Sequence, residues 1–449
     1  MLAVARSRGG SPEAATVAAV VCVLVTLDGG DLLSPIAGWG PVAAVVLAGI
    51  TYMVVDRLAA GFNLRWMLWA VAVGLLVFNG FNLLRLLAAE STGTEQEEVA
   101  EAPAHQASES SPDVVVLILD EFASPETTPL EPVDWERLLA LTQSGYEMSP
   151  LIWSPYSISA AAIAAILDGG YPLKDGEVLN EATIRRLGAI TRGDSRLVET
   201  LKARGYRFTM IEGGLWLSSC GPEVDHCERS HPIDEAMGVL LRRSAFRWWY
   251  ERLWGDAFAA TGMHSMSRTR RVVMDAAIND RADLVFSHVM LPHIPYVLDR
   301  ECRLHGLVHA DYTTPDQRLA GYQRQAGCVV EWLVETLSDL DEVTAGPPPI
   351  VVVLGDHGTN FGGQVLRPVR DWTVDDVRER LGTFVTYRLP EDCRPRGADT
   401  IAQLTDTLIA CVSGVPASLD ASYFLVSYGD DPPTARQIPS VGSGSQESG

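Results

Sequence analysis

The chain has 449 residues and a formal net charge of -22, from 57 acidic and 35 basic side chains. Such an acidic chain lacks the basic face that nucleic acids require, which argues against nucleic acid as a partner. Its mean hydropathy of +0.10 is high for a soluble protein, so apolar residues must be concentrated in one region. The length predicts a membrane part and one large domain, or two domains.

Three apolar segments within 1–89 predict a membrane domain with about three transmembrane helices, at 14–27, 33–55 and 66–87. A span needs roughly 20 predominantly apolar residues, and the second and third segments supply them. The first segment is shorter, so a signal-peptide core or a buried helix remains an alternative for it.

The charges beside these segments predict how the chain is oriented. Arg6 and Arg8 precede the first segment, Arg57 and Arg65 lie between the second and third, and the loop between the first and second has no basic residue. The positive-inside rule then places everything after the third segment on the extracytoplasmic side of an inner or plasma membrane. The lipid bilayer is therefore a predicted partner. The orientation stays open if the first segment does not span.

The rest of the chain predicts one large domain, at 113–429, between two polar segments. An acidic stretch without periodicity at 90–112 predicts a flexible linker, and a Pro-, Ser- and Gly-rich stretch at 430–449 predicts a disordered tail. Strands are predicted at 114–119, 207–211, 284–291, 350–354 and 383–387, and helices at 135–144, 195–204, 317–340 and 400–413. Their alternation predicts an α/β fold with a largely parallel sheet.

The predicted domain contains six cysteines, an even number that suits an oxidising compartment. Cys220 and Cys227 flank a short Gly-Pro loop that a disulfide could close, so they are the best candidates for a pair. A zinc cluster is the alternative, although the C-x2-C spacing typical of zinc sites is absent. The pairing of the other four cysteines stays open.

Two acidic residues follow two predicted buried strands. Asp120 comes directly after 114–119, and Asp356 and His357 come after 350–354 in the sequence GDHG. Ligands of parallel sheets bind outside the carboxyl ends of the strands, so these side chains can converge on one site. A carboxylate beside an imidazole suits a hard or borderline divalent metal ion. The alternative is that GDHG only forms a strand-ending turn.

Serine and histidine residues add candidates for catalysis. The segment 154–172 reads SPYSISAAAIAAILDGGYP, a Ser-rich turn before a helix whose N-terminus suits an anion such as phosphate. A serine there can act as a metal-activated nucleophile, or it can be a plain N-cap. In FSHVMLPHIPYVLD, at 286–299, His288 and His293 can bind an anion or protonate a leaving group. The alternative for both is a structural loop histidine.

In this order over 113–424, the motifs resemble the alkaline phosphatase/sulfatase superfamily. They look closest to its membrane-anchored sulfatase-like branch, which includes lipoteichoic acid synthases and phosphoethanolamine transferases. The resemblance implies a three-layer α/β/α sandwich that binds a divalent metal ion. The run VVVLILDEF matches the family's opening strand and implies that Asp120 is a metal ligand, and GDHG implies the same for Asp356 and His357.

The resemblance also implies the substrate contacts and the nucleophile. LPHIPY is similar to the family's P-H-x-P segment, which implies that His293, with His288 nearby, contacts a substrate phosphate or sulfate. In the family the nucleophile precedes the Tyr of a G-x-Y-P segment by twelve residues. Counting back from Tyr171 gives Ser159, which would also contact the metal, and Ser157 is the second choice.

The chain departs from true sulfatases at three places. The residues after Ser159 lack the Arg of the C/S-x-P/A-x-R context in which formylglycine forms. No Lys of a G-K-W segment follows Gly205-Tyr206, and Glu121 stands where sulfatases often have a second metal-binding Asp. These departures favour phosphoryl or phospho-alcohol transfer through an unmodified serine over sulfate hydrolysis.

The functional hypothesis is a membrane-anchored, metal-dependent hydrolase or transferase that acts on an anionic phosphate or sulfate ester, such as a lipid head group. Mn²⁺, Zn²⁺, Mg²⁺ and Ca²⁺ all suit the mixed oxygen and nitrogen ligands. Two alternatives belong to other classes: a sulfatase that uses unmodified Ser159, and a non-catalytic envelope protein that retains the fold for binding.

Overall fold

The structure is a computed structural model that describes 111–213, 219–228, 247–279, 281–304, 314–344, 346–395 and 397–441. The side chains of the helix that begins at Arg247 are described from Gly262 onwards. The chain divides into two compact units. The sheet and the candidate site described below lie in the unit formed by 104–236 and 252–449, whereas the first residues of the helix that begins at Arg247, up to Glu251, belong to the other unit. The predicted membrane domain and nearly all of the predicted linker lie outside the described residues.

A seven-stranded sheet forms the centre of this unit, in the order β2-β7-β6-β1-β5-β3-β4. Its strands are β1 (Val114–Leu119), β2 (Glu147–Trp153), β3 (Arg207–Ile211), β4 (His226–Glu228), β5 (Asp283–Val289), β6 (Ile350–Gly355) and β7 (Gly382–Arg388). The central strands β6, β1, β5, β3 and β4 are parallel, and β7 runs antiparallel to both of its neighbours. The five predicted strands and the largely parallel sheet are confirmed, whereas β2 and β4 are not among the predicted elements.

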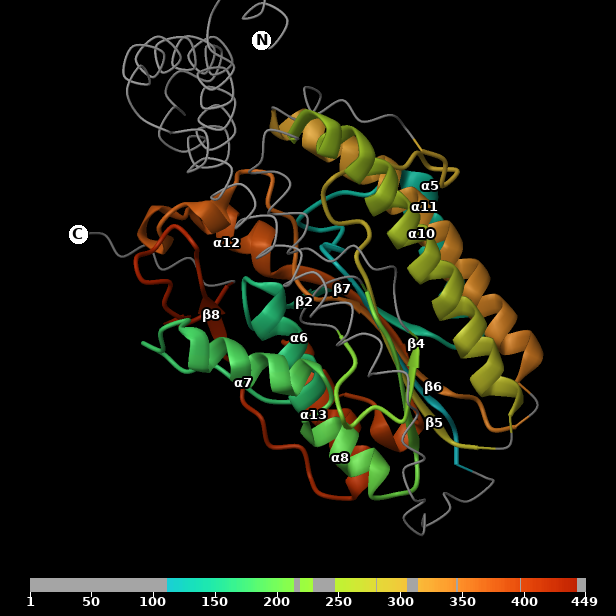
Figure 1. The fold of residues 1–449 in the computed structure, drawn as a ribbon. Helices are drawn as coiled ribbons and strands as arrows, with labels where there is room; N and C mark the ends of the chain where they lie inside the picture. Colours follow the sequence, from blue (N-terminus) through green and yellow to red (C-terminus); the bar gives the residue numbers. More distant parts are fainter. Residues whose placement is uncertain are drawn as a thin grey trace, which may run out of the picture. The chain divides into compact units, whose positions relative to one another are not determined.

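Two layers of helices cover the sheet, as Figure 1 shows. One layer contains α5 (Pro132–Ala140), α10 (Arg247–Ile278) and α11 (Pro315–Val343), and the other contains α6 (Ser159–Asp168), α7 (Glu181–Thr191), α8 (Arg196–Lys202) and α13 (Ile401–Ser413). The short helix α12 (Val374–Leu381) precedes β7. The three-layer α/β/α arrangement implied by the family resemblance is therefore observed.

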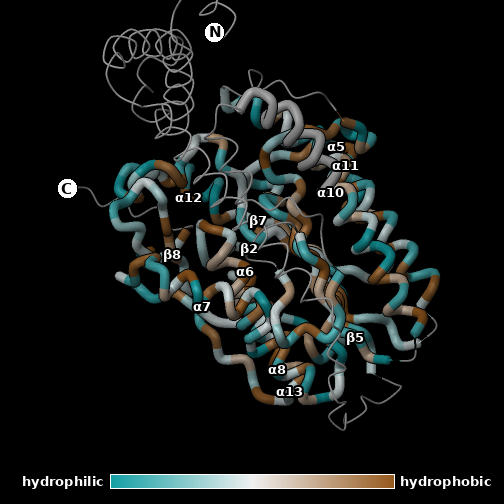
Figure 2. Tube along the Cα trace, viewed as in Figure 1, coloured by the Kyte–Doolittle hydropathy of each residue, from teal (hydrophilic) through white to brown (hydrophobic). Residues whose placement is uncertain are grey.

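Each layer has its own hydrophobic core, because successive side chains of a strand point to opposite faces of a sheet. Val115, Leu117 and Leu119 of β1 pack with α5, α10 and α11, whereas Val116 and Ile118 pack with α6, α8 and α13. All six residues of β1 are buried, which explains why its sequence is an uninterrupted apolar run. Teal and brown residues alternate along α11 in Figure 2, as expected for a helix with one face on a core.

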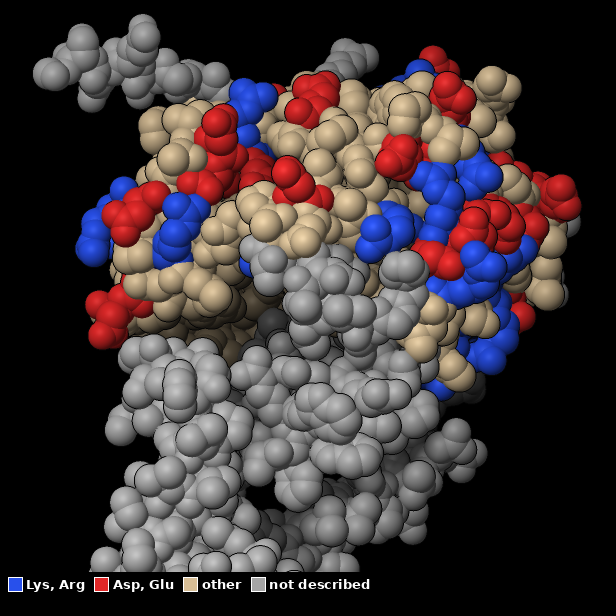
Figure 3. Space-filling view, turned by 90° about the horizontal axis from the view of Figure 1, so that it is seen from above, with Lys and Arg blue, Asp and Glu red and all other residues tan. Residues whose placement is uncertain are grey.

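The outer surface of the α10 and α11 layer is held by ion pairs. Arg270 of α10 contacts Glu335 at 3.0 Å and also pairs with Asp339, both on α11. Figure 3 shows acidic and basic side chains interspersed on the face seen from above, most densely on the side where these helices lie in Figure 1. Exposed pairs of this kind contribute at most about 1 kcal/mol each.

The predicted helix ends agree well with the structure. The predicted helix at 135–144 appears as α5 followed by a 3-10 turn, and it ends at Gly145 with a φ of 82°. Gly169 ends α6 with a φ of 57°, a left-handed conformation that glycine adopts without strain. The helices predicted at 195–204, 317–340 and 400–413 correspond to α8, α11 and α13. The long helix α10 is not predicted.

The boundary predicted for the disordered tail, at 430, is wrong for 430–441. Arg436–Ile438 forms the strand β9, which pairs antiparallel with β8 (Tyr423–Leu425). Ala435 is buried, and its N–H donates to the carbonyl of Glu177. The Pro- and Ser-rich composition is misleading here because backbone pairing and burial stabilise the segment. Residues 442–449 lie outside the described residues.

The described residues contain three disulfides: Cys220–Cys227, Cys302–Cys328 and Cys393–Cys411. The predicted pair Cys220–Cys227 is confirmed. The side chain of Glu212 lies beside this pair, but the zinc-cluster alternative is wrong because the two sulfurs are bonded to each other and are not thiolate ligands. None of the helices within the described ranges is both long and apolar enough to cross a bilayer.

Candidate metal centre and nucleophile

The candidate site lies where three adjacent central strands end. Asp120 follows β1, Asp356 follows β6, and His288 lies near the end of β5. The register pairs Leu119 with Gly355 and Ile118 with His288, so the three side chains reach the same edge of the sheet. This is the edge at which parallel α/β sheets bind ligands.

Asp120, His288 and Asp356 form a buried cluster that fits a divalent metal ion. One ligand atom from each lies within 4.8 Å of the other two, and His288 Nε2 is 3.5 Å from Asp120 Oδ2. Both carboxylate oxygens of Asp120 and Oδ2 of Asp356 are buried and accept no hydrogen bond from the described residues. Buried carboxylates without donors are costly, and a cation would offset that cost.

The pKa values of Asp120 and Asp356 also indicate a site for a cation. Burial, followed by the charge of Asp120, raises the pKa of Asp356 from 3.8 to about 7. Burial also opposes ionisation of Asp120, but His293 and His288 outweigh it and hold the pKa of Asp120 below its usual range. The two carboxylates have oxygens within 4.8 Å of each other, so they repel when both are ionised. A divalent cation between them would offset this repulsion.

The carboxylate of Asp356 is held in one orientation by the backbone. Its Oδ1 accepts hydrogen bonds from the N–H of Glu121 at 3.1 Å and from the N–H of His357 at 2.9 Å, which leaves Oδ2 for the cluster. Glu121 adopts a φ of 60°, a strained conformation for a residue other than glycine. We interpret this strain as the cost of directing the Glu121 N–H at Asp356.

Ser159 is the first residue of α6, and its side chain faces the GDHG turn. Its Oγ lies 2.8 Å from Nε2 of His357. The N-cap of α6 is Ile158, which makes no side-chain capping bond, so the plain N-cap interpretation of Ser159 is wrong. The second-choice nucleophile, Ser157, is buried, and its Oγ both donates to the carbonyl of Val426 at 2.8 Å and accepts from its N–H at 2.7 Å.

His357 is held as a neutral acceptor. Its Nδ1 faces the carbonyl of Gly358 at 3.0 Å, so Nδ1 carries the proton and the lone pair of Nε2 acts as an acceptor. Burial and the nearby Arg380 hold the pKa of His357 well below 6.5. The Nε2 atom lies 3.0 Å from Nη2 of Arg380, which donates to it, and 3.1 Å from Asp356 Oδ2.

The two predicted substrate-contacting histidines take different places. His288 lies with the two aspartates, so the structure places it among potential metal ligands. His293 is partly exposed on the loop after β5, with Nε2 3.8 Å from Oε1 of Glu121. Burial opposes the charged form of His293, but Glu121 and Asp120 outweigh it and raise the pKa. The raised pKa favours the charged form of His293 at the rim, and its contact with a substrate anion stays a prediction.

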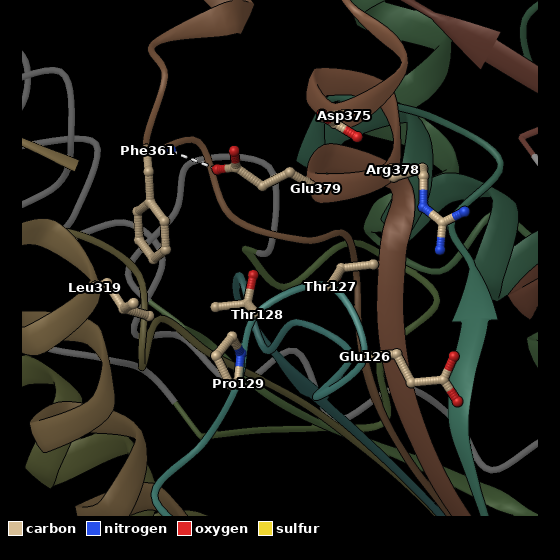
Figure 4. Close-up of a pocket in the computed structure, with 9 residues that line it drawn as sticks. All are labelled: Glu126, Thr127, Thr128, Pro129, Leu319, Phe361, Asp375, Arg378 and Glu379. Atoms are coloured by element: carbon tan, nitrogen blue, oxygen red, sulfur yellow. Dashed lines mark hydrogen bonds between the residues drawn. The ribbon is translucent and has the colours of Figure 1, made fainter. Parts of the chain in front are cut away.

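Arg380 of α12 contacts both Glu121 and His357, and it is not among the residues predicted from the sequence. No motif surrounds it, and one Arg among many carries no signal. On the other side of α12 lies a cavity of about 320 Å³, shown in Figure 4. It is lined by Glu126, Thr127, Thr128, Pro129, Leu319, Phe361, Asp375, Arg378 and Glu379, and none of these is a predicted site residue.

Comparisons with known proteins give structural likeness only, because no protein-family model and no curated protein matches the chain. The C-terminal periplasmic domain of EcEptC from Escherichia coli is similar at a TM-score of 0.45 and 10% identity, over 73% of this chain and 94% of that chain. The lipoteichoic acid synthase LtaP from Listeria monocytogenes gives 0.43 and 12%, over 72% and 79%. A protein in the alkaline phosphatase superfamily from Vibrio parahaemolyticus gives 0.43 and 12%, over 71% and 73%.

All three likenesses are distant. Their TM-scores lie below 0.5, so the proposals that follow rest on the residues of this chain.

Proposed function

We propose that this domain is a metal-dependent phosphoryl or phospho-alcohol transferase or hydrolase that uses Ser159 as its nucleophile. One observation carries the proposal: Ser159 Oγ lies 2.8 Å from the acceptor nitrogen of a neutral His357, beside the buried Asp120–His288–Asp356 cluster. A serine used only for capping would not need this partner.

The proposed first step is attack of Ser159 Oγ on the phosphorus of the ester. His357 Nε2 accepts the hydroxyl proton as the new O–P bond forms and the bond to the leaving alcohol breaks. The proton then passes to the leaving oxygen. Water or an acceptor alcohol next attacks the phosphoserine and loses its proton to His357 Nε2. His357 passes this proton to Ser159 Oγ as the bond between Oγ and phosphorus breaks, which releases the product and restores Ser159. The N–H groups at the start of α6 and the imidazole of His293 face the anionic group.

A divalent ion held by Asp120, Asp356 and His288 would supply positive charge beside the nucleophile and the substrate. The prediction that Ser159 is a further ligand remains part of the proposal. His357 is proposed as the proton acceptor instead of a ligand, because its Nδ1 carries a proton and its Nε2 faces Ser159 and Arg380. Asp120, Glu121 and Asp356 can carry three negative charges, and Arg380 supplies one permanent positive charge. A divalent ion would balance the two negative charges that Arg380 leaves uncompensated.

The disulfides favour an extracytoplasmic location, because such bonds persist in oxidising compartments. Together with the apolar segments within 1–89, they support a membrane-anchored enzyme whose substrate is an anionic ester of a cell-envelope lipid or glycan. The location and the substrate are both parts of the proposal.

The test compares p-nitrophenyl phosphate, bis(p-nitrophenyl) phosphate and p-nitrophenyl sulfate, each with Mn²⁺, Zn²⁺, Mg²⁺ or Ca²⁺. We expect turnover of a phosphate ester that depends on the metal, and a phosphoserine at 159 in rapidly quenched protein. Preference for the sulfate would support the sulfatase alternative. Failure to bind any of the four ions at equilibrium would support a non-catalytic protein.

A further inference from the structure

We infer that Arg380 is a positioning residue that holds the Ser159 segment and the His357 segment in reacting geometry, an inference that rests on the proposed function. Its guanidinium donates to groups from three chain segments that meet at the site. Nε donates to the carbonyl of Ser157 at 2.8 Å, and Nη2 donates to His357 Nε2 at 3.0 Å. Nη1 donates to Glu121 Oε1 at 2.9 Å and to the carbonyl of Gly358 at 3.0 Å.

These contacts connect the nucleophile with its proton acceptor. Ser157 lies two residues before Ser159, and its carbonyl is fixed by the same guanidinium that contacts His357. Because the guanidinium is planar and rigid, the positions of its acceptors are fixed relative to one another. A displacement of about 1 Å between reacting groups can cost about 100-fold in rate. Arg380 therefore controls the distance on which the proposed proton transfer depends.

Arg380 also determines which form of His357 faces Ser159. The Arg380 Nη2 group can only donate, so His357 Nε2 must be the acceptor, and the Gly358 carbonyl receives the Nδ1 proton. Arg380 in turn is kept in place by Glu121, with which it forms a buried ion pair at 2.9 Å. Breaking a buried pair by removing one partner leaves an uncompensated charge.

The helix that carries Arg380 is anchored on its other side as well. The carboxylate Oε1 of Glu379 accepts from the N–H of Phe361 at 2.6 Å and from Thr359 Oγ1 at 3.1 Å, and Figure 4 shows the contact with Phe361. Thr373 begins α12 with a capping box. Glu379 and Arg380 thus fix α12 to the segment that follows His357.

The contacts of Arg380 argue against direct binding of the substrate. All three nitrogens of its side chain donate to protein acceptors, and the residue is only 5% exposed. A group that binds the anion directly would keep donors directed at solvent or at a cavity. The expected effect of replacing Arg380 is therefore on kcat rather than on KM.

The test uses the metal-loaded wild type with Arg380→Gln and Arg380→Lys, assayed on the phosphate ester that the wild type turns over best. We expect Arg380→Gln to lower kcat about 100-fold, with KM changed by less than about 3-fold. Arg380→Lys keeps the positive charge but not the planar guanidinium group, and we expect it to lower kcat about 10-fold. Arg378→Gln, two residues away on α12 and lining the cavity, is the matched control and should keep wild-type kinetics.

Crystal structures and metal titration separate this inference from the proposed function. In Arg380→Gln we expect the Ser159 Oγ to His357 Nε2 distance to exceed hydrogen-bonding range, with no weakening of Mn²⁺ affinity. An unchanged distance, or a KM or phosphate inhibition constant raised tenfold or more at constant kcat, would overturn the positioning role. If the wild type turns over no ester, the proposed function fails. The positioning role of Arg380 is then tested by the distance from Ser159 Oγ to His357 Nε2 in the Arg380→Gln structure. If Arg380→Gln does not fold, the same measurements on Arg380→Lys decide it.

Discussion

Replacing Ser159 with alanine should abolish turnover and leave the fold almost unchanged. The substitution removes one hydroxyl group at the first position of α6, where alanine is a good helix former. Within the part of the chain that the structure describes, Ser159 Oγ makes one hydrogen bond, to His357 Nε2, and this nitrogen still accepts from Arg380 after the substitution. The loss in free energy of unfolding should be about 1 kcal/mol, the usual value of one hydrogen bond.

The loss in kcat should be far larger. Without Oγ the covalent step cannot occur, and only binding and electrostatic stabilisation of direct water attack remain. We expect kcat to fall at least about 10³-fold, which corresponds to about 4 kcal/mol in the activation free energy. The assay is release of p-nitrophenol at saturating Mn²⁺, with urea unfolding of the same preparation. Calorimetric titration should show Mn²⁺ bound with little change in affinity.

Ser157→Ala is the matched control. This serine precedes Ser159 by two residues, but its hydroxyl group holds the backbone of Val426 and has no role in the proposed reaction. Its loss leaves the N–H and carbonyl of buried Val426 without their partner. We expect a loss of about 2–4 kcal/mol in the free energy of unfolding and a kcat within a few-fold of the wild type. Full activity in Ser159→Ala, or abolished activity in Ser157→Ala alone, would refute the choice of nucleophile.

Three further predictions concern the metal, a disulfide and pH. His288→Ala should weaken Mn²⁺ binding about 10–100-fold in equilibrium titration. The exposed His264 on α10 is the control, and equal affinities in the two variants would exclude His288 as a ligand. Replacing Cys302 and Cys328 by alanine opens a loop with a sequence separation of 26 and should lower the free energy of unfolding by about 3.5 kcal/mol, measured in urea. A loss below about 1 kcal/mol would contradict the loop-entropy argument. Burial raises the pKa of Asp113 from 3.8 to about 7, so the folded state binds this proton more tightly than the unfolded state. The contribution of Asp113 to stability should therefore decrease as pH rises from about 4 to about 7. In Asp113→Asn the dependence of stability on pH should be flatter over this range, and parallel curves would refute the assignment.

The sequence predicts the strands of the central sheet because they are buried on both faces. Such strands appear as uninterrupted apolar runs between turn signals, as at 114–119 and 350–354, and β1 is buried at every position. The short edge strand β4 carries no such run, since its three residues are all partly exposed. The sequence does not predict the long helix α10 either, because its residues, rich in Arg and aromatic side chains, form no clear apolar stripe.

The sequence alone also determined that acids end two buried strands and that a serine begins a helix. The family resemblance of the motifs implied that Asp120, Asp356 and His357 bind a metal, and the family's spacing before Tyr171 implied Ser159 as the nucleophile. The sequence did not predict that His288 would lie among the potential metal ligands. Its side chain reaches the aspartates only because β5 pairs with β1 in the observed register.

Only the tertiary structure shows what the two serines face and reveals Arg380. The spacing from Tyr171 favours Ser159 over Ser157, but the sequence does not show that Ser157 Oγ contacts Val426 whereas Ser159 Oγ contacts His357. Arg380 is 221 residues from Ser159 along the chain. It reaches the site because the N–H of Gly358, in the turn after β6, donates to the carbonyl of Arg380 on α12. Hydrogen bonds across such separations depend on packing that no local pattern encodes.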